Sequence, residues 1–201
     1  MKVLFIYVDN TTAIGFNAGI GVLSAVLKRA GHQTRLLHIS DELSYPLDLE
    51  RIAADVQDYQ PGLICFSITT NHWHAVRKVG QSLKEKFAIP IIVGGSHPTA
   101  DVDAVIKEPW VDIVCLGEGD IALPELVARL QDNQPLTGVH NLVYKHGGEV
   151  VTEPLGMFVE DLDSLPYDDR TIFYYERIID SRSGWAEVIV TRGCPYPCTY
   201  C

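Results

Sequence analysis

Residues Leu63 to Gly95 give the clearest indication of the fold, and they read LICFSITTNHWHAVRKVGQSLKEKFAIPIIVGG. It opens with a continuous apolar run at 63–68, continues with a helical pattern at 74–87, and closes with a second apolar run at 89–95. Short Ile- and Val-rich runs that alternate with amphipathic helices are typical of parallel strands covered on both faces. The stretch therefore predicts one strand–helix–strand unit of a parallel sheet.

The same alternation continues in both directions along the chain. Right-handed crossovers between parallel strands leave few topologies and favour an open, doubly wound sheet. We therefore expect an α/β fold, with a doubly wound five-stranded parallel sheet of the flavodoxin-like or Rossmann-like kind across residues 1–135. The expected strands are 2–8, 33–39, 63–68, 89–95 and 111–117, and the expected helices are 18–30, 48–59, 74–87, 100–108 and 121–133.

The pattern changes after this domain. Two β-prone runs around a Gly-Gly pair predict a hairpin at 141–153. Residues 154–184 are irregular and rich in Pro and Asp, which is typical of a linker laid over a surface. One more apolar run, WAEVIVT at 185–191, predicts a strand that leads into a cysteine-rich segment. The expected divisions are a binding domain at 1–135, a hairpin and linker at 136–184, and the start of a further domain at 185–201.

Charge and hydropathy exclude several classes of protein. The chain has 201 residues, with 16 Lys and Arg against 26 Asp and Glu, for a formal net charge of −10. This acidic balance argues against sequence-independent nucleic-acid binding, which depends on clustered Lys and Arg. No apolar run reaches the roughly 18 residues needed to span a bilayer, and the start does not resemble a signal peptide. We expect a cytoplasmic protein with no nucleic-acid or membrane partner.

Four loops follow the carboxyl ends of the first, third, fourth and fifth strands, where doubly wound sheets bind ligands. They are rich in Gly, Thr, Ser and Asn and poor in Lys and Arg. Glycine lets a backbone approach a ligand closely and hydroxyl groups hydrogen-bond it, so this edge favours a large, mostly neutral cofactor. A binding module for a flavin, or for another small molecule, stays open as an alternative. The loops are 9–17, 69–74, 94–99 and 117–120.

The chemistry-bearing motif is Cys-x3-Cys-x2-Cys, formed by Cys194, Cys198 and Cys201. Closely spaced thiolates can converge on one metal centre, and soft sulfur selects an iron–sulfur cluster or zinc. Three ligands leave one iron of a cubane open, as a catalytic cluster needs. A structural zinc protein, closed by a fourth ligand from elsewhere, is the other possibility. Cys65 and Cys115 lie in apolar runs and are expected to be small core residues.

At this motif the chain resembles the radical S-adenosylmethionine superfamily, whose hallmark is the same cysteine spacing. The lead-in Thr191-Arg192-Gly193 and the aromatic Tyr200 strengthen the likeness. The resemblance implies that Cys194, Cys198 and Cys201 hold a 4Fe–4S cluster that reductively cleaves S-adenosylmethionine, with Tyr200 near its adenine. It also implies that residues 185–191 are the first strand of a β/α barrel that is truncated at Cys201, so that this fragment alone is inactive.

The region before the motif resembles the cobalamin-binding domain found upstream in one class of these enzymes. The likeness lies in 19–32, 93–99, 112–120 and the linker 161–166. The loop from Asp9 to Gly15 lacks the His of the Asp-x-His-x-x-Gly motif, so no imidazole from that motif would reach cobalt. The residues that the resemblance implies contact cobalamin are Asn10, Thr11, Thr12, Gly15, Ser67, Thr69, Thr70, Gly94, Gly95, His97, Gly117, Glu118 and Gly119.

The resemblance also sets an expectation for the whole enzyme. It implies a cobalamin-dependent methyltransferase, or an enzyme of related C–C or C–H chemistry, that acts on a small-molecule substrate the sequence does not identify. A reductant such as flavodoxin or ferredoxin would supply the electron.

Overall fold

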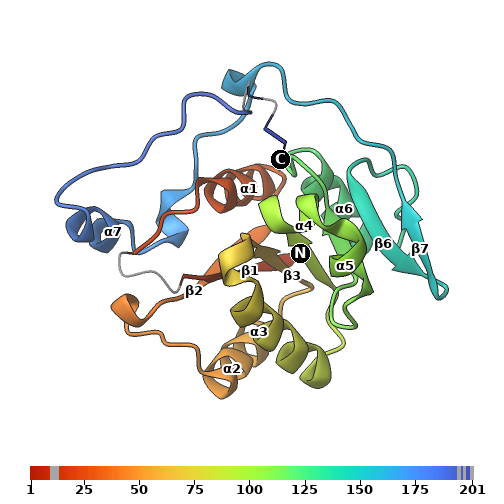
Figure 1. Cartoon of the computed structure of the whole chain (residues 1–201), viewed down its shortest axis with the longest axis horizontal. Helices are drawn as coiled ribbons and strands as arrows, with labels where there is room; N and C mark the ends of the chain where they lie inside the picture. Colours follow the sequence, from red (N-terminus) through yellow and green to blue (C-terminus); the bar gives the residue numbers. More distant parts are fainter. Residues whose placement is uncertain (10–13, 194–195, 197, 200–201) are drawn as a thin grey trace.

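The computed structural model describes residues 1–9, 14–193, 196, 198 and 199, and it shows a mixed sheet with helices on both faces (Figure 1). The sheet has seven strands in the order β2-β1-β3-β4-β5-β6-β7. The first five are parallel, and their order, 2-1-3-4-5, is that of a flavodoxin-like doubly wound sheet. They are β1 (Lys2–Val8), β2 (Gln33–Ile39), β3 (Leu63–Ser67), β4 (Ile91–Gly94) and β5 (Ile113–Cys115).

Two hydrophobic layers cover the two faces of the parallel strands. The helices are α1 (Ala18–Arg29), α2 (Leu49–Tyr59), α3 (Trp73–Lys86), α4 (Ser96–Ala100), α5 (Val102–Lys107) and α6 (Ala122–Gln131). Because successive strand residues point to opposite faces, Leu4 and Ile6 pack with α2, α3 and α5, whereas Val3 and Phe5 pack with α1 and α6. The predicted α/β fold and its five parallel strands are confirmed.

The helix expected at 100–108 differs from the prediction. The chain is already helical from Ser96, and Asp101, with a φ of −138°, separates α4 from α5. A non-helical backbone at one residue interrupts the ladder of main-chain hydrogen bonds, so one expected helix becomes two short ones. The earlier start brings His97 into the first turn after β4.

The hairpin extends the sheet. Strands β6 (Leu142–His146) and β7 (Glu149–Thr152) pair with each other, and β6 pairs antiparallel with β5. Leu142 is fully buried and Tyr144 nearly so. An unpaired β5 would expose a row of backbone donors and acceptors, and the hairpin covers that edge.

The linker is anchored on α1 and contains a helix of its own, α7 (Tyr175–Ser181) (Figure 1). The N–H of Asp169 donates to the carbonyl oxygen of Gly21 at 2.9 Å. The Asp169 carboxylate accepts from Ser24 Oγ at 2.6 Å and lies 2.6 Å from Lys28 Nζ. A Cβ on Gly21 would lie 3.2 Å from Cβ of Asp168, so the glycine allows this close approach. Asp169 therefore acts as a buried anchor of the linker.

The strand expected at 185–191 differs from the prediction. The structure describes all seven of these residues and assigns them no helix or strand. Trp185 is 78% exposed and Val190 is 79% exposed. A strand forms only where a neighbouring strand completes its hydrogen bonds, and no strand of the described sheet lies beside this segment. Across the described residues, no helix has the length and apolar character needed to cross a bilayer.

Candidate functional site

Loops from four parallel strands meet at the carboxyl edge of the sheet. The point where the strand order reverses lies between β1 and β3, which are hydrogen-bonded neighbours. Ligands of doubly wound sheets bind outside the carboxyl ends of the strands at such a point. The described part of this edge includes Asp9 and residues 14–17 after β1, and Gly117–Asp120 after β5. It also includes Ser67–Thr70, which begins with the last residue of β3, and Gly94–His97, which begins with the last residue of β4.

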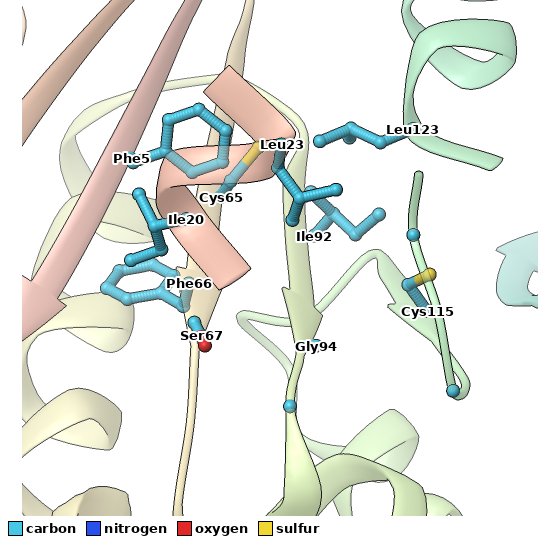
Figure 2. Close-up of a pocket in the computed structure, with 13 residues that line it drawn as sticks. Phe5, Ile20, Leu23, Cys65, Phe66, Ser67, Ile92, Gly94, Cys115 and Leu123 are labelled. Atoms are coloured by element: carbon cyan, nitrogen blue, oxygen red, sulfur yellow. The ribbon is translucent and has the colours of Figure 1, made fainter. Parts of the chain in front are cut away.

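An apolar slot opens at this edge, between the sheet and helices α1 and α6 (Figure 2). Ile20 and Leu23 of α1 and Leu123 of α6 form one wall, and Phe5 and Ile92 of the sheet form the other. Its volume is about 70 Å³, well below the roughly 150 Å³ of an apolar cavity that binds benzene. The slot can therefore take the edge of a flat ring, and a whole ring would need α1 and α6 to move apart.

Two buried cysteines make the slot walls neutral. Cys65 of β3 and Cys115 of β5 both line the slot. Burial raises the pKa of the Cys65 thiol well above its ordinary value, and burial, with a smaller effect of Asp120, raises that of Cys115 to about 12. Both side chains are therefore uncharged thiols at neutral pH. Their predicted place in the core is confirmed, while their position in the slot was not predicted.

Glycines shape the mouth of the slot. Gly95 has a φ of +102°, and a Cβ there would lie 2.6 Å from the carbonyl oxygen of Ile68. Only glycine lets this loop rest on the backbone after β3. A Cβ on Gly119 would lie 3.2 Å from Cδ2 of Leu23, so its missing side chain keeps the slot open. Gly94 and Gly117 complete the glycine lining.

Uncharged polar side chains surround the mouth. Asn17 caps α1 by accepting from the N–H of Ile20 at 3.0 Å, and its Nδ2 donates to Oγ of Ser67 at 3.1 Å. Thr70 Oγ1 lies 3.3 Å from Nδ1 of His97, and the centroid of the His97 ring lies 4.6 Å from that of Trp73, with the rings tilted by 44°. Thr69 and Thr70 are exposed, so their hydroxyl groups can contact a ligand.

A buried polar cluster supports the loop after β1. The Asp9 carboxylate accepts from the N–H of Gly15 at 2.5 Å and lies 3.4 Å from Nε2 of His38. Burial, and then the charge of Asp9, raises the pKa of Tyr7 to about 12. Burial lowers the pKa of His72, which faces the Tyr7 ring, so this imidazole is neutral near pH 7. Sequence reasoning missed His38, because its strand pattern alone marks it as a core position.

The loop after β5 joins three distant segments. The carbonyl oxygen of Glu118 accepts from Nδ2 of Asn141, which precedes β6, at 3.0 Å. Its carboxylate accepts from the N–H of Val159 in the linker at 3.4 Å. Arg192 donates to both carboxylate oxygens of Asp120, at 2.7 and 3.2 Å. The hydrogen bond to Asp120 is the main reason why the pKa of Arg192 is raised. This loop is therefore a junction as well as a part of the slot.

Three comparisons place the chain among known proteins. The family model described as the B12 binding domain matches residues 5–127, more than half of the chain. The chain belongs to the B12-binding domain family. The matched region contains β1 from Phe5 onward, the other four parallel strands, α1 to α5, and most of α6. The slot and its glycine-lined mouth therefore lie within a B12-binding domain.

Two curated relatives and one solved structure are similar to the chain. An uncharacterized methyltransferase of Pyrococcus horikoshii is 26% identical over 100% of this chain and 45% of its own length. The anaerobic magnesium-protoporphyrin IX monomethyl ester cyclase of Rubrivivax gelatinosus is 27% identical over 100% of this chain and 38% of its own. The chain thus spans less than half the length of either relative. The cobalamin-dependent S-adenosylmethionine radical enzyme OxsB, solved with aqua-cobalamin and S-adenosylmethionine, has the same fold, with a TM-score of 0.71 at 18% identity over 90% of this chain and 25% of that one.

The described residues of the predicted site divide into two groups. Ser67, Gly94, Gly95, Gly117 and Gly119 line the slot of the B12-binding domain, and Thr69, Thr70 and His97 lie beside its mouth. Gly15 donates its N–H to Asp9 and the Glu118 side chain faces Arg192, and neither residue lines the slot. The apolar walls from α1 and α6 were missed, because helical spacing alone does not separate a slot wall from ordinary core.

Several predicted residues lie outside those that the structure describes. They are Asn10, Thr11 and Thr12 of the first loop, and Cys194, Tyr200 and Cys201 of the cysteine motif. Cys198 is described, and its thiol is free and exposed. Exposure of this thiol is compatible with a metal ligand, while the cluster site itself stays a prediction.

Proposed function

We propose that this B12-binding domain holds cobalamin over the carboxyl edge of its sheet, as part of a longer radical S-adenosylmethionine enzyme. The single observation that supports it most is the apolar slot beneath a glycine-lined, uncharged mouth, within the region that matches the family. The cysteine motif at residues 194–201 supports the second half of the proposal.

The residues present fit cobalamin. The corrin ring carries many amide groups, and Asn17, Ser67, Thr69 and Thr70 offer donors and acceptors for them. The slot would take the edge of the flat, apolar end of the nucleotide tail, and the whole of that group once α1 and α6 move apart. Gly119 leaves space for it, and the neutral Cys115 thiol forms part of the wall. None of the slot-lining side chains is charged, which suits this apolar group.

Cys198, with Cys194 and Cys201, would hold the 4Fe–4S cluster. Bound cobalamin supplies a transferable methyl group, and the cluster with S-adenosylmethionine supplies the electron chemistry that activates an unreactive carbon. The chain's own residues bind these groups, orient them and keep the slot free of water. A small-molecule substrate, a flavodoxin- or ferredoxin-like reductant and a cytoplasmic location complete the proposal.

Methyl transfer is the activity that we propose for the complete enzyme. The similarity to the magnesium-protoporphyrin cyclase favours a second candidate, in which the same two cofactors close a ring without adding a carbon. S-adenosylmethionine labelled in its methyl group separates the two, because only a methyltransferase leaves the label in its product.

Visible spectra of the purified chain, mixed with hydroxocobalamin and passed through a desalting column, test cobalamin binding. We expect the wild-type chain to retain corrin absorbance. Gly119→Val should lose at least about tenfold in affinity, since its new methyl groups meet Leu23 and fill the slot. Ala128→Leu is the matched control, because it adds apolar bulk on an exposed position of α6 and should bind as the wild type does. A folded wild-type chain that retains no corrin would contradict the proposal.

The cluster is tested in the full-length enzyme. Anaerobic reconstitution with iron and sulfide should produce a broad charge-transfer absorbance in the wild type and not in Cys198→Ala. Cys65→Ala is the control, because that buried thiol lies in the slot and is not expected to bind iron. Stoichiometric zinc with no such absorbance would favour the structural zinc site instead.

A further inference from the structure

Arg192 immediately precedes Gly193 and the cysteine motif, and it is held in a defined place. Its two terminal nitrogens form a fork on the Asp120 carboxylate, at 2.7 and 3.2 Å, and Nη1 lies 3.5 Å from Oε1 of Glu118. The Asp120 side chain is only 6% exposed. A planar guanidinium on a buried carboxylate fixes both position and orientation, which a lysine cannot do. The contact therefore sets where the backbone before the motif stands.

The rest of the segment has few other attachments. Residues 185–191 have no regular secondary structure, and their apolar side chains at 185, 188, 189 and 190 are exposed. Arg170 and Arg182 contact Glu187, and both belong to the linker. Among the contacts found in the described part of the chain, the Arg192 fork is the one that joins this segment to the carboxyl edge of the sheet.

We propose that Arg192 is a positioning residue, which with Asp120 and Glu118 holds the backbone that leads into the cysteine motif at the carboxyl edge of the sheet. The cofactors assigned to the slot and to the cysteine motif rest on the proposed function. The anchoring by Arg192 requires neither cofactor. Gly117 and Gly119 of the same loop line the slot. A ligand in the slot and Arg192 on the Asp120 and Glu118 carboxylates therefore contact the same loop, the one after β5. Ligand binding and the attachment of Arg192 should therefore stabilise each other.

Trypsin tests the anchor directly, because it cleaves after Arg192 only when this segment detaches. The cleavage of the bond between Arg192 and Gly193 in the reduced 201-residue chain is followed by mass spectrometry. We expect Asp120→Asn to speed this cleavage at least about tenfold, which corresponds to about 1.4 kcal/mol. Glu118→Gln should have a smaller effect, because it lies farther from the guanidinium. Arg192→Lys keeps the cleavage site and the charge but loses the fork, so it should cleave faster than the wild type.

Glu125→Gln is the matched control. It breaks a 3.0 Å ion pair with Arg129 on α6, close to the same loop, and should leave cleavage after Arg192 unchanged. Equal rates in this control, Arg192→Lys and Asp120→Asn, with all three folded by circular dichroism, would overturn the proposal. If Asp120→Asn fails to fold, Arg192→Lys and Glu118→Gln decide, since both retain the buried carboxylate.

Hydroxocobalamin adds a second arm to the same assay. Saturation with the corrin should slow cleavage after Arg192 in the wild type by several-fold and have less effect in Asp120→Asn. A corrin that binds without changing the wild-type rate would overturn the coupling. If no corrin binds at all, the proposed function fails, while the first arm still decides whether Arg192 is an anchor.

Discussion

The loops after β4 and β5 lie on the same edge of the sheet and line the same slot, yet they are held in different ways. The loop after β4 rests on backbone: the N–H of His97 donates to the carbonyl oxygen of Ile68 at 3.1 Å, and Gly95 lies against the same residue. The loop after β5 is held by side chains of Asn141 and Arg192, the latter 72 residues from its partner. The β4 loop is therefore positioned by the backbone of the neighbouring strand, and the β5 loop by segments far along the chain.

We expect the largest loss of stability from a substitution in the β4 loop. Gly95→Val should lower the free energy of unfolding by about 3 kcal/mol, because it combines a left-handed backbone with a collision against the Ile68 backbone. Urea unfolding followed by circular dichroism measures it. Gly117→Ala is the comparison, because Gly117 also has a positive φ, +65°, but has open space around its Cβ. It should cost only about 1 kcal/mol. Equal losses would mean that the contact with Ile68 is unimportant.

We expect a smaller loss of stability when the contacts of Asn141 with the β5 loop are removed. Asn141 donates to Glu118, accepts from the N–H of Gly156 at 2.7 Å, and has a φ of +65°. Asn141→Ala should cost about 2 kcal/mol in urea unfolding, from two lost hydrogen bonds and backbone strain. Asn141→Gly removes the same hydrogen bonds without the strain, so it should cost about 1 kcal/mol. If glycine is as costly as alanine, the hydrogen bonds alone hold this junction.

We expect the smallest change in the pH dependence of stability, which involves Asp169 of the linker. Although burial opposes it, hydrogen bonds from Lys28, Ser24 and Thr171 lower the pKa of Asp169 below its ordinary value. A carboxyl whose pKa is depressed in the folded state stabilises the fold above its unfolded pKa, near 4, and loses this contribution as pH falls through the folded value. Stability should therefore drop less between pH 6 and pH 3 in Asp169→Asn than in the wild type.

Urea midpoints at several pH values measure this difference. Asp58→Asn is the control, because the Asp58 side chain is 77% exposed and its pair with Arg35 contributes little. An Asp169→Asn variant with the same pH dependence as the wild type would show that the linker anchor does not depend on charge.

The glycines of the β4 loop could be predicted from the sequence, and the side-chain contacts of the β5 loop could not. Gly94-Gly95 directly follows an apolar run, so strand periodicity alone places it at the carboxyl edge of the sheet. The hydrogen-bond partners of Glu118 and Asp120 lie 23 to 72 residues away in the chain, beyond α6, and no periodicity relates their positions. The hairpin was predicted as an element, but its pairing with β5 depends on which sheet edge lies open beside it.

The segment at 185–191 shows the opposite failure. Its apolar pattern matches that of the five parallel strands, yet the structure gives it no strand partner. An apolar pattern indicates how well a segment would pack within a sheet. A strand also requires an adjacent strand that completes its backbone hydrogen bonds, which the pattern does not reveal. The same pattern therefore predicted β1 to β5 and failed here.

The parallel α/β sheet, the carboxyl edge at which we propose that cobalamin binds, and the cysteine spacing all follow from the sequence, because each depends on local periodicity or on short chain separation. The tertiary structure was needed to show that Cys65 and Cys115 line a slot beside α1 and α6, that Asp169 anchors the linker, and that Arg192 contacts Asp120. These depend on contacts between residues far apart in the chain, which form only when the whole domain has folded and buried its two apolar layers.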